Sequence, residues 1–212
     1  MSPLAFRERL ADGDPAGLLV LHHGRGADEN DLLALGDVLD PERRLHLVSP
    51  RAPMTLAGWP GYHWYVVQRV GYPDRESFHR AFEALAELHD GLWERTGLSA
   101  QQTVLGGFSM GSVMSYSLGL APGRPAPAGI LAFSGFVPVV EGWEPELDDR
   151  QAVRVFIAHG RSDPVIGVDF ARRARALLEG AGLDVEYEET DGAHHIDPTV
   201  VPQAVSWLAE TI

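Results

Sequence analysis

The chain has 212 residues, 45% of them hydrophobic, which predicts one globular domain spanning residues 1–212. Its formal net charge of −13 disfavours nucleic acid as a partner, because an acidic surface repels the phosphate backbone. Cysteine is absent, which excludes disulfides, cysteine-based zinc sites and a cysteine nucleophile. The sequence contains neither an apolar run long enough for a membrane span nor the apolar core of a secretory signal at its start, so we expect a cytoplasmic protein.

Short apolar runs bounded by turn residues predict strands along the whole chain. The middle runs are apolar nearly throughout, as expected for strands buried on both faces of a parallel sheet. The last run alternates apolar and charged residues, which favours an edge position, and the first is expected to be antiparallel. In chain order the predicted strands are 6–10, 17–22, 45–49, 103–108, 129–134, 153–159 and 183–190.

Helical patterns alternate with these strands. In the longest, Phe78, Phe82 and Leu85 recur at spacings of three and four, and Gly97 provides a C-terminal stop. Alternation of strand and helix predicts a three-layer α/β sandwich with a mostly parallel central sheet. The predicted helices are 74–96, 109–120, 169–179 and 198–210.

The segment 103–112 carries the most informative motif of the chain. An apolar run leads into Gly107-Phe108-Ser109-Met110-Gly111, and a helix of small residues follows. In such a strand–turn–helix element a serine is held out in a strained backbone conformation, and side chains at the flanking glycines would clash. The segment therefore makes Ser109 a candidate nucleophile, although a glycine-rich turn without chemistry would show the same pattern.

Polar residues follow the other predicted strands. Because functional groups gather at the carboxyl ends of parallel strands, we expect Asp163 and a histidine after residue 190 to meet Ser109. The order Ser–Asp–His along the chain is that of α/β-hydrolases. For the acid, Asp163 lies one short turn after a strand end, which favours it over three other candidates, namely Asp169, Asp191 and Asp197.

Four motifs in this order resemble the phospholipase/carboxylesterase group of small α/β-hydrolases, which includes the acyl-protein thioesterases. The resemblance runs from about Leu18 to Pro198 and implies the α/β-hydrolase fold, hydrolysis of esters or thioesters, no cofactor and no large lid domain. No metal is expected, because the His-x3-His spacing of a helical zinc site is missing, although nine histidines leave a zinc site as an alternative. The motifs are His23-Gly24-x-Gly26, Gly107-Phe108-Ser109-Met110-Gly111, His159-Gly160-x-x-Asp163-Pro164-Val165 and Ala193-His194.

The resemblance also implies roles for particular residues. The family pattern favours His194 over His195 as the base, with Ser109 as nucleophile and Asp163 as the acid that orients the imidazole. The backbone N–H groups of Met110 and Arg25 are expected to form an oxyanion hole. Arg25 departs from the family, which has a smaller apolar residue there, and this favours a substrate with a polar or carboxylate-bearing arm.

Substrate-binding residues are predicted from aromatic and apolar residues near strand ends. Trp64 and Tyr65 belong to an aromatic cluster after the third strand, and Phe136 and Val137 follow the fifth. These four residues are expected to line an acyl pocket, with an aromatic core beneath a long loop as the alternative for the first two.

The leading hypothesis is a serine carboxylesterase that acts on small-molecule esters with short to medium acyl chains. Thioesterase or lysophospholipase activity on the same triad is the first alternative, and a non-catalytic binding protein with this fold is the second. A homodimer is compatible with the resemblance, and the sequence does not identify the physiological substrate.

Overall fold

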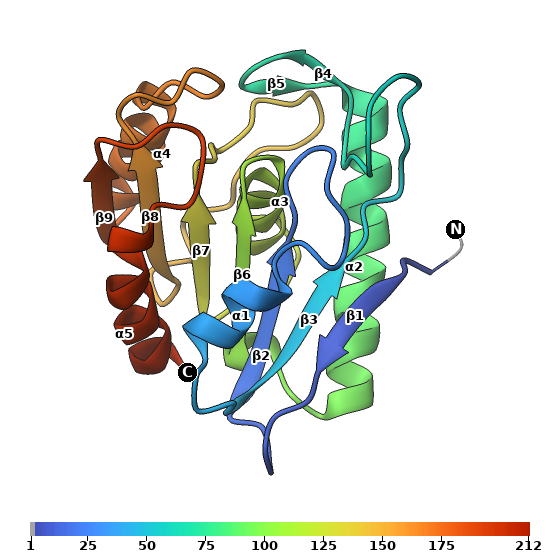
Figure 1. Cartoon of the computed structure of the whole chain (residues 1–212), viewed down its shortest axis with the longest axis vertical. Helices are drawn as coiled ribbons and strands as arrows, with labels where there is room; N and C mark the ends of the chain where they lie inside the picture. Colours follow the sequence, from blue (N-terminus) through green and yellow to red (C-terminus); the bar gives the residue numbers. More distant parts are fainter. Residues whose placement is uncertain (1–2) are drawn as a thin grey trace.

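The computed structural model describes residues 3–212 and has a seven-stranded sheet between two layers of helices (Figure 1). The strand order is β1-β3-β2-β6-β7-β8-β9; β1 is antiparallel to β3, and every other pairing in this sheet is parallel. The predicted mostly parallel α/β sandwich is thus confirmed. The strands are β1 Phe6–Arg9, β2 Gly17–His22, β3 Leu45–Pro50, β6 Thr103–Phe108, β7 Gly129–Phe133, β8 Arg154–Gly160 and β9 Asp184–Thr190.

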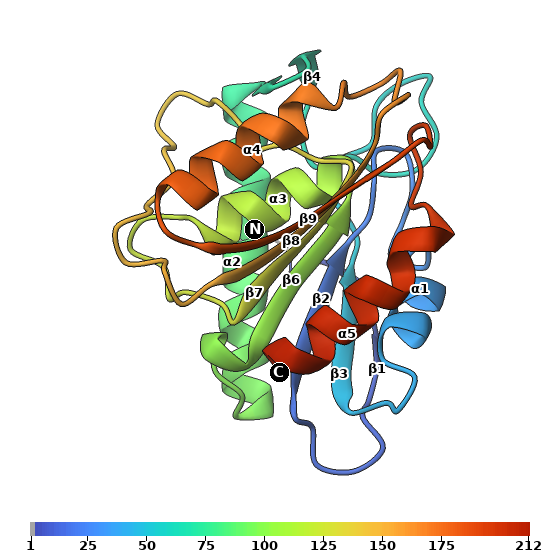
Figure 2. The same ribbon diagram turned by 90° about the vertical axis from the view of Figure 1, so that its left-hand side faces the viewer.

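Helices cover both faces of the sheet (Figure 2). α2 (Arg75–Thr96), α3 (Met110–Gly119) and α4 (Asp169–Gly180) lie on one face, and α1 (Leu33–Leu39) and α5 (Val201–Thr211) lie on the other. Alternate residues of each central strand supply the two cores. In β2, for example, Leu18 packs toward the first group of helices and Leu19 toward the second.

Local signals explain where the longest helix begins and ends. The Asp74 carboxylate accepts a hydrogen bond from the Ser77 N–H at 3.0 Å, which caps the first turn of α2. Gly97 ends the helix in the left-handed conformation, with φ of 71°. As expected, β9 lies at an edge of the sheet and is only half-buried, whereas β2, β3 and β7 are buried throughout.

Several elements differ from the sequence prediction. The short helix α1 and the hairpin of β4 (Val67–Arg69) and β5 (Tyr72–Pro73) were not expected, because each is too short to show a periodic pattern. Residues 198–210 were predicted as one helix, but a 3-10 turn, η2 (Pro198–Val200), precedes α5; another such turn, η1 (Ala100–Gln102), precedes β6. Within residues 3–212 no lid domain separates the core strands, and no helix is long and apolar enough to cross a membrane.

A pair of buried histidines lies between β2 and α2. The rings of His22 and His89 stack with centroids 5.6 Å apart, and the His22 Nδ1 atom lies 2.8 Å from the Ser115 hydroxyl. Burial lowers the pKa of His89 to about 3 and the pKa of His22 well below its usual value. Both imidazoles are therefore neutral in the folded protein at neutral pH.

These histidines make stability dependent on pH. A base whose pKa is lowered by folding binds protons more readily when unfolded, so its contribution is complete above about pH 6.5 and is lost as pH falls toward its folded pKa. We expect the free energy of unfolding to fall below about pH 6.5, by up to about 1.4 kcal/mol per pH unit for each such histidine. Urea unfolding of His89→Phe between about pH 7 and about pH 5 should show a shallower loss than the wild type. Parallel curves for the two proteins would contradict this assignment.

Candidate active site

Ser109 occupies a strained turn between β6 and α3. Its backbone has φ of 56° and ψ of −118°, a conformation that non-glycine residues rarely adopt. A Cβ atom at Gly107 would overlap the backbone of Gly111, and one at Gly111 would overlap the His22 carbonyl group. The Ser109 N–H donates to the Phe133 carbonyl group at 2.8 Å, which ties the turn to β7. The glycines therefore allow the tight packing that keeps the serine at the end of β6.

Three side chains from separate loops meet at the carboxyl edge of the sheet. The His194 Nε2 atom lies 2.8 Å from the Ser109 Oγ atom, and the Nδ1 atom lies 2.6 Å from the Asp163 Oδ2 atom. Ser109 is 7% exposed and the Asp163 side chain is fully buried, whereas the His194 side chain is 17% exposed. The structure thus brings these three predicted residues into one chain of hydrogen bonds, of which His194 is the most exposed member.

The Asp163 carboxylate is held on both oxygen atoms. Oδ1 accepts hydrogen bonds from the N–H groups of Val165 and Ile166, each at 2.8 Å, and Oδ2 accepts from His194. Burial by itself raises the pKa of this carboxyl group, but the hydrogen bonds from His194, Ile166 and Val165 outweigh it, so the pKa is lowered. Asp163 is therefore ionised at neutral pH, so it can only accept a hydrogen bond, and the Nδ1 atom of His194 carries the hydrogen that it accepts.

His159 is a neighbour of the site to which sequence reasoning gave no role. Its Nε2 atom donates to the Ile166 carbonyl group at 2.7 Å and lies 3.3 Å from the Asp163 Oδ2 atom. Burial lowers the pKa of His159, so this buried ring is neutral at neutral pH. The ring closes the turn that presents Asp163. Its place in the His-Gly-x-x-Asp motif was the only signal in the sequence.

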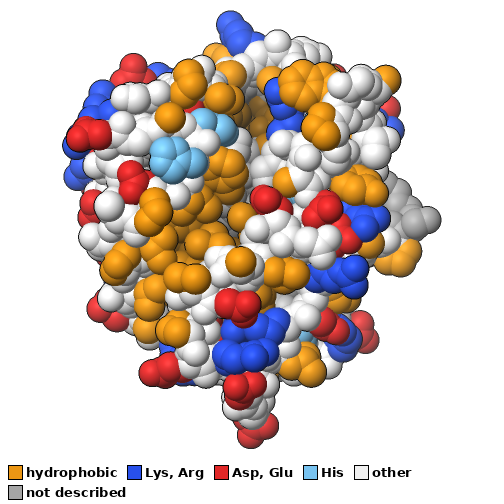
Figure 3. Space-filling model, viewed as in Figure 1, with side chains coloured by type: hydrophobic (Ala, Val, Ile, Leu, Met, Phe, Trp, Pro, Cys, Tyr) orange, Lys and Arg blue, Asp and Glu red, His pale blue; other side chains and the backbone are white. Residues whose placement is uncertain are grey.

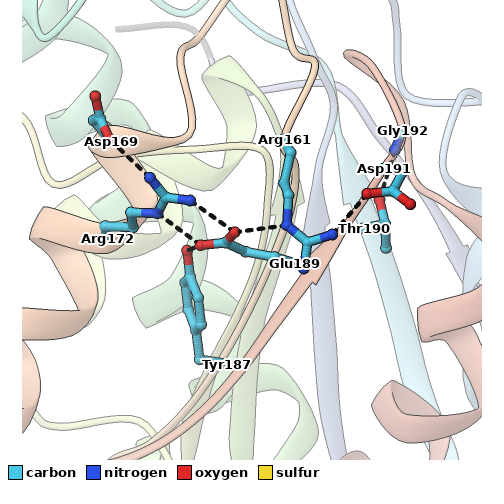
Figure 4. A network of polar contacts seen from close by, with 8 residues as sticks. All are labelled: Arg161, Asp169, Arg172, Tyr187, Glu189, Thr190, Asp191 and Gly192. Carbon is cyan, nitrogen blue, oxygen red and sulfur yellow. Dashed lines mark hydrogen bonds and ion pairs between the residues drawn. The ribbon is translucent and has the colours of Figure 1, made fainter.

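A cluster of charged side chains joins the loop of Asp163 to the loop of His194 (Figure 4). Glu189 in β9 pairs with Arg161 at 3.1 Å and with Arg172 of α4 at 2.8 Å, and the Tyr187 hydroxyl group donates to it at 2.7 Å. Arg161 also pairs with Asp191 at 2.7 Å. Arg161 is two residues before Asp163 and Asp191 is three before His194, so these ion pairs connect the two loops directly.

Backbone contacts reinforce this connection. The N–H of Arg161 donates to the Thr190 carbonyl group at 2.8 Å, and the N–H of Ser162 donates to that of Gly192 at 3.1 Å. A Cβ atom at Gly160 would overlap the carbonyl groups of Gly192 and Ala193. The acid and the histidine thus stand on two segments that touch along their backbones.

The two predicted oxyanion-hole donors belong to two different segments at this edge of the sheet. Met110 begins α3, directly after Ser109, and Arg25 lies in the loop after β2, next to Gly24. An ideal Cβ atom on Gly24 would stand 3.0 Å from the Phe108 ring, so this loop packs on the residue before the serine. No hydrogen bond within residues 3–212 occupies the N–H of either Arg25 or Met110.

The prediction that Trp64 and Tyr65 line the cleft is wrong. The Trp64 side chain is fully buried, and its indole N–H donates to the His23 carbonyl group at 2.9 Å. Tyr65 is 3% exposed and packs on Phe78, with ring centroids 6.2 Å apart. The loop after β3 turns both rings into the core, where the indole N–H finds an acceptor. Trp64 therefore contacts the segments next to the site from within the core, through His23 and Met110.

Phe136 and Val137, by contrast, line a groove, although Ser109, Asp163 and His194 are not among its lining residues. It has a volume of about 360 Å³ and lies between the loop after β7, the β5 strand and α4. The Phe136 ring packs against Phe170 of α4, with centroids 5.3 Å apart. The other lining residues are Gly71, Tyr72, Pro138, Val139, Pro145, Arg173, Ala174 and Leu177. Apart from Arg173, the lining is mainly apolar, as an acyl chain would require.

Comparison with known proteins identifies the family. The sequence profile of the phospholipase/carboxylesterase family matches residues 10–212. The chain belongs to this family. Among its relatives, the putative hydrolase MhqD of Bacillus subtilis is 27% identical over 200 residues, which cover 94% of this chain and 96% of MhqD. An acyl-protein thioesterase 1 of Debaryomyces hansenii is also 27% identical, over 71% of this chain and 69% of its own.

A solved structure agrees with this placement. The carboxylesterase of Bacillus cereus superposes with a TM-score of 0.86 at 23% identity, covering 100% of this chain and 96% of that one. The α/β-hydrolase fold predicted from the sequence is thereby confirmed. As a phospholipase/carboxylesterase family member, the chain is a serine hydrolase of the esterase and thioesterase class.

The charged cluster around Glu189 is expected to contribute to stability. Hydrogen bonds from Arg172, and secondarily from Tyr187 and Arg161, hold the pKa of Glu189 at about 2. A carboxyl group whose pKa is lowered stabilises the fold above its unfolded pKa of about 4.3 and loses this effect as pH falls toward 2. Because the partner arginines are half-exposed, we expect Glu189→Gln to cost about 1–2 kcal/mol at neutral pH and much less below about pH 3.

Chemical unfolding at the two pH values measures this difference. The matched control is Glu179→Gln, which removes an exposed partner of Arg175 within α4 and should cost less than about 0.5 kcal/mol. Equal losses in the two variants would show that the cluster does not stabilise the contact between the loops.

Proposed function

We propose that the protein is a serine carboxylesterase that hydrolyses esters with short to medium acyl chains through an acyl-enzyme intermediate. The observation that carries this proposal is the chain of hydrogen bonds from Ser109 through His194 to Asp163, with distances of 2.8 and 2.6 Å. Membership of an esterase family supports the reaction class.

The first half-reaction acylates the serine. Because ionised Asp163 accepts the Nδ1–H of His194, the free lone pair of the imidazole is on Nε2 and faces the Ser109 hydroxyl group. Nε2 takes the hydroxyl proton as Oγ bonds to the carbonyl carbon of the ester. Asp163 stabilises the imidazolium that forms. The imidazolium then protonates the departing alcohol, and the acyl group remains on Ser109.

The second half-reaction uses the same groups in reverse. Water enters the position of the departed alcohol and loses a proton to the Nε2 atom of His194 as its oxygen bonds to the acyl carbon. The proton returns to Ser109 Oγ when the acid leaves. In both halves the tetrahedral oxyanion would be bound by the N–H groups of Met110 and Arg25. Loss of one such donor typically costs about 3–4 kcal/mol of transition-state stabilisation.

The groove beside Phe136 and Val137 supports the choice of acyl chain. A volume of about 360 Å³ lies at the lower end of the range of small-molecule sites and suits a chain of a few to several carbons. A thioester of the same acyl group would use the same residues, since the relatives include acyl-protein thioesterases. Comparing octanoyl esters with the octanoyl thioester of a small thiol would separate the two activities, and a non-catalytic binding protein would turn over neither.

Removing the nucleophile tests the mechanism. We expect Ser109→Ala to hydrolyse p-nitrophenyl butyrate at least about 10⁴-fold more slowly than the wild type, because no covalent intermediate can form. It should also fail to bind a fluorophosphonate probe, while its circular dichroism remains native. The control is Ser206→Ala, at an exposed serine of α5, which should react and hydrolyse like the wild type. Undiminished turnover by Ser109→Ala would end the assignment.

Narrowing the groove tests the acyl site. We expect Val137→Phe to reduce kcat/KM for p-nitrophenyl octanoate by about tenfold or more, because each lost apolar contact is worth about 1 kcal/mol, and to affect the acetate ester little. Val38→Phe, at an exposed position of α1, should leave the dependence on chain length as in the wild type. An equal loss for both esters would place the acyl chain elsewhere.

A further inference from the structure

Like Arg173 at the groove beside Phe136, Arg25 is an arginine that stacks on an aromatic ring and has no acidic partner within residues 3–212. It is exposed, and its guanidinium group lies 4.1 Å from the ring centroid of Trp59. Within the described part of the chain, residues 3–212, no carboxylate lies within 4.0 Å of it, whereas Arg161 and Arg172 beside the same site are each paired with two acidic side chains. In a chain with net charge −13, this guanidinium keeps its donors available.

The position of this cation is set by a locked loop. The N–H of Gly26 donates to the Tyr62 carbonyl group at 2.9 Å, and the N–H of Tyr62 donates to that of Ala27 at 2.8 Å. The loop of Arg25 is therefore tied by a pair of backbone bonds to the loop that carries Trp59. Stacking on the indole then restrains the long side chain, which reduces the entropy lost when it binds a ligand.

Contacts with the catalytic loops place the loop of Arg25 beside His194. Gly24, its neighbour, packs on the Phe108 ring, and that ring lies 5.0 Å from the His194 ring by their centroids. Burial lowers the pKa of His63 beneath the loop, and the charge of Arg25 lowers it further. Figure 3 shows a hollow at this end of the molecule, with histidine atoms on one side and hydrophobic and arginine atoms on the other.

The two loops that flank Ser109 carry different side chains. The acyl groove beside Phe136 is lined from the loop after β7 and from α4, whereas Arg25 belongs to the loop after β2. In the sheet, β2 and β7 flank β6, so these two loops lie on opposite sides of Ser109. An ester whose acyl chain occupies the groove would extend its alcohol part toward Arg25.

We propose that Arg25 binds a carboxylate on the alcohol part of the substrate, so that the preferred substrates are esters of hydroxy acids. The inference rests on the proposed esterase function and adds the substrate class to it. A planar guanidinium can donate two parallel hydrogen bonds to a carboxylate, and a lysine in its place would not reproduce this geometry. The backbone N–H of Arg25 would serve the oxyanion at the same time, so one residue would act on both ends of the reacting ester.

Two isosteric esters test the inference. The 4-carboxyphenyl and 4-carbamoylphenyl esters of butyric acid differ in the charge of the leaving group and form the same butyryl-enzyme. The measured quantity is the ratio of kcat/KM for the charged ester to kcat/KM for the neutral one. We expect Arg25→Gln to lower this ratio by about 5- to 30-fold, and Arg25→Lys to give an intermediate value. The substituted side chain leaves the backbone N–H in place, and taking a ratio cancels any effect on the chemical step common to both esters.

Salt and a charge control complete the experiment. Raising NaCl from about 0.02 M to about 0.5 M should lower the ratio for the wild type and leave it unchanged for Arg25→Gln. Arg80→Gln removes the same charge from the exposed face of α2 and should keep the wild-type ratio. A third substrate, p-nitrophenyl hydrogen glutarate, carries its carboxylate on the acyl part. A dependence on Arg25 for this ester alone would overturn the assignment to the alcohol part.

The outcomes separate this inference from the proposed function. If the wild type hydrolyses both butyrate esters and the ratio is equal in the wild type, Arg25→Gln and Arg80→Gln, only the role of Arg25 fails. If the wild type hydrolyses neither ester and does not react with the fluorophosphonate probe, the esterase assignment fails and the inference fails with it.

Discussion

Both nitrogen atoms of the His194 ring are committed, and this one arrangement organises the rest of the site. Nδ1 donates to a buried carboxylate that two backbone N–H groups and a histidine ring surround, so Asp163 can be ionised without water. Nε2 is thereby left as an acceptor facing the hydroxyl group of Ser109. The chemistry of the serine thus depends on how firmly the histidine and the acid are held against each other.

The distance between Asp163 and His194 is set by contacts outside the site. The loops of Asp163 and His194 follow adjacent parallel strands, β8 and β9, whose ladder runs to Gly160 and Thr190. Beyond the ladder, the close approach at Gly160 and the ion pairs of Glu189 continue the contact. Because β9 is an edge strand, it has a neighbour on one side only, and the charged cluster links it to α4 instead. The ion pair with α4 therefore gives β9 a contact on the side where it has no neighbouring strand.

The loops on the two sides of Ser109 differ in their side chains. On one side, α4 and the loop after β7 present mainly apolar side chains together with Arg173, and on the other, the loops after β2 and β3 are bonded to each other and present Arg25 over Trp59. The buried Trp64 connects the loops after β2 and β3 to the turn that carries Ser109. Its indole N–H donates to the His23 carbonyl group, and its backbone N–H donates to the Met110 sulfur atom.

Sequence alone was sufficient for the sheet, the long helices and the identity of the triad candidates, because buried strands have continuous apolar runs and polar residues at their ends gather at one edge. Three kinds of information came only from the tertiary structure. Whether Trp64 faces a cleft or the core depends on the path of an irregular loop, which leaves no periodic signal. The sequence places His159 and Asp163 in one motif but does not show that their side chains meet. Nor does it show that Glu189 joins Arg161 to Arg172, because these residues are far apart in the chain. The sequence shows which residues follow a strand. The direction and the partners of each side chain are decided by packing among elements that are far apart in sequence.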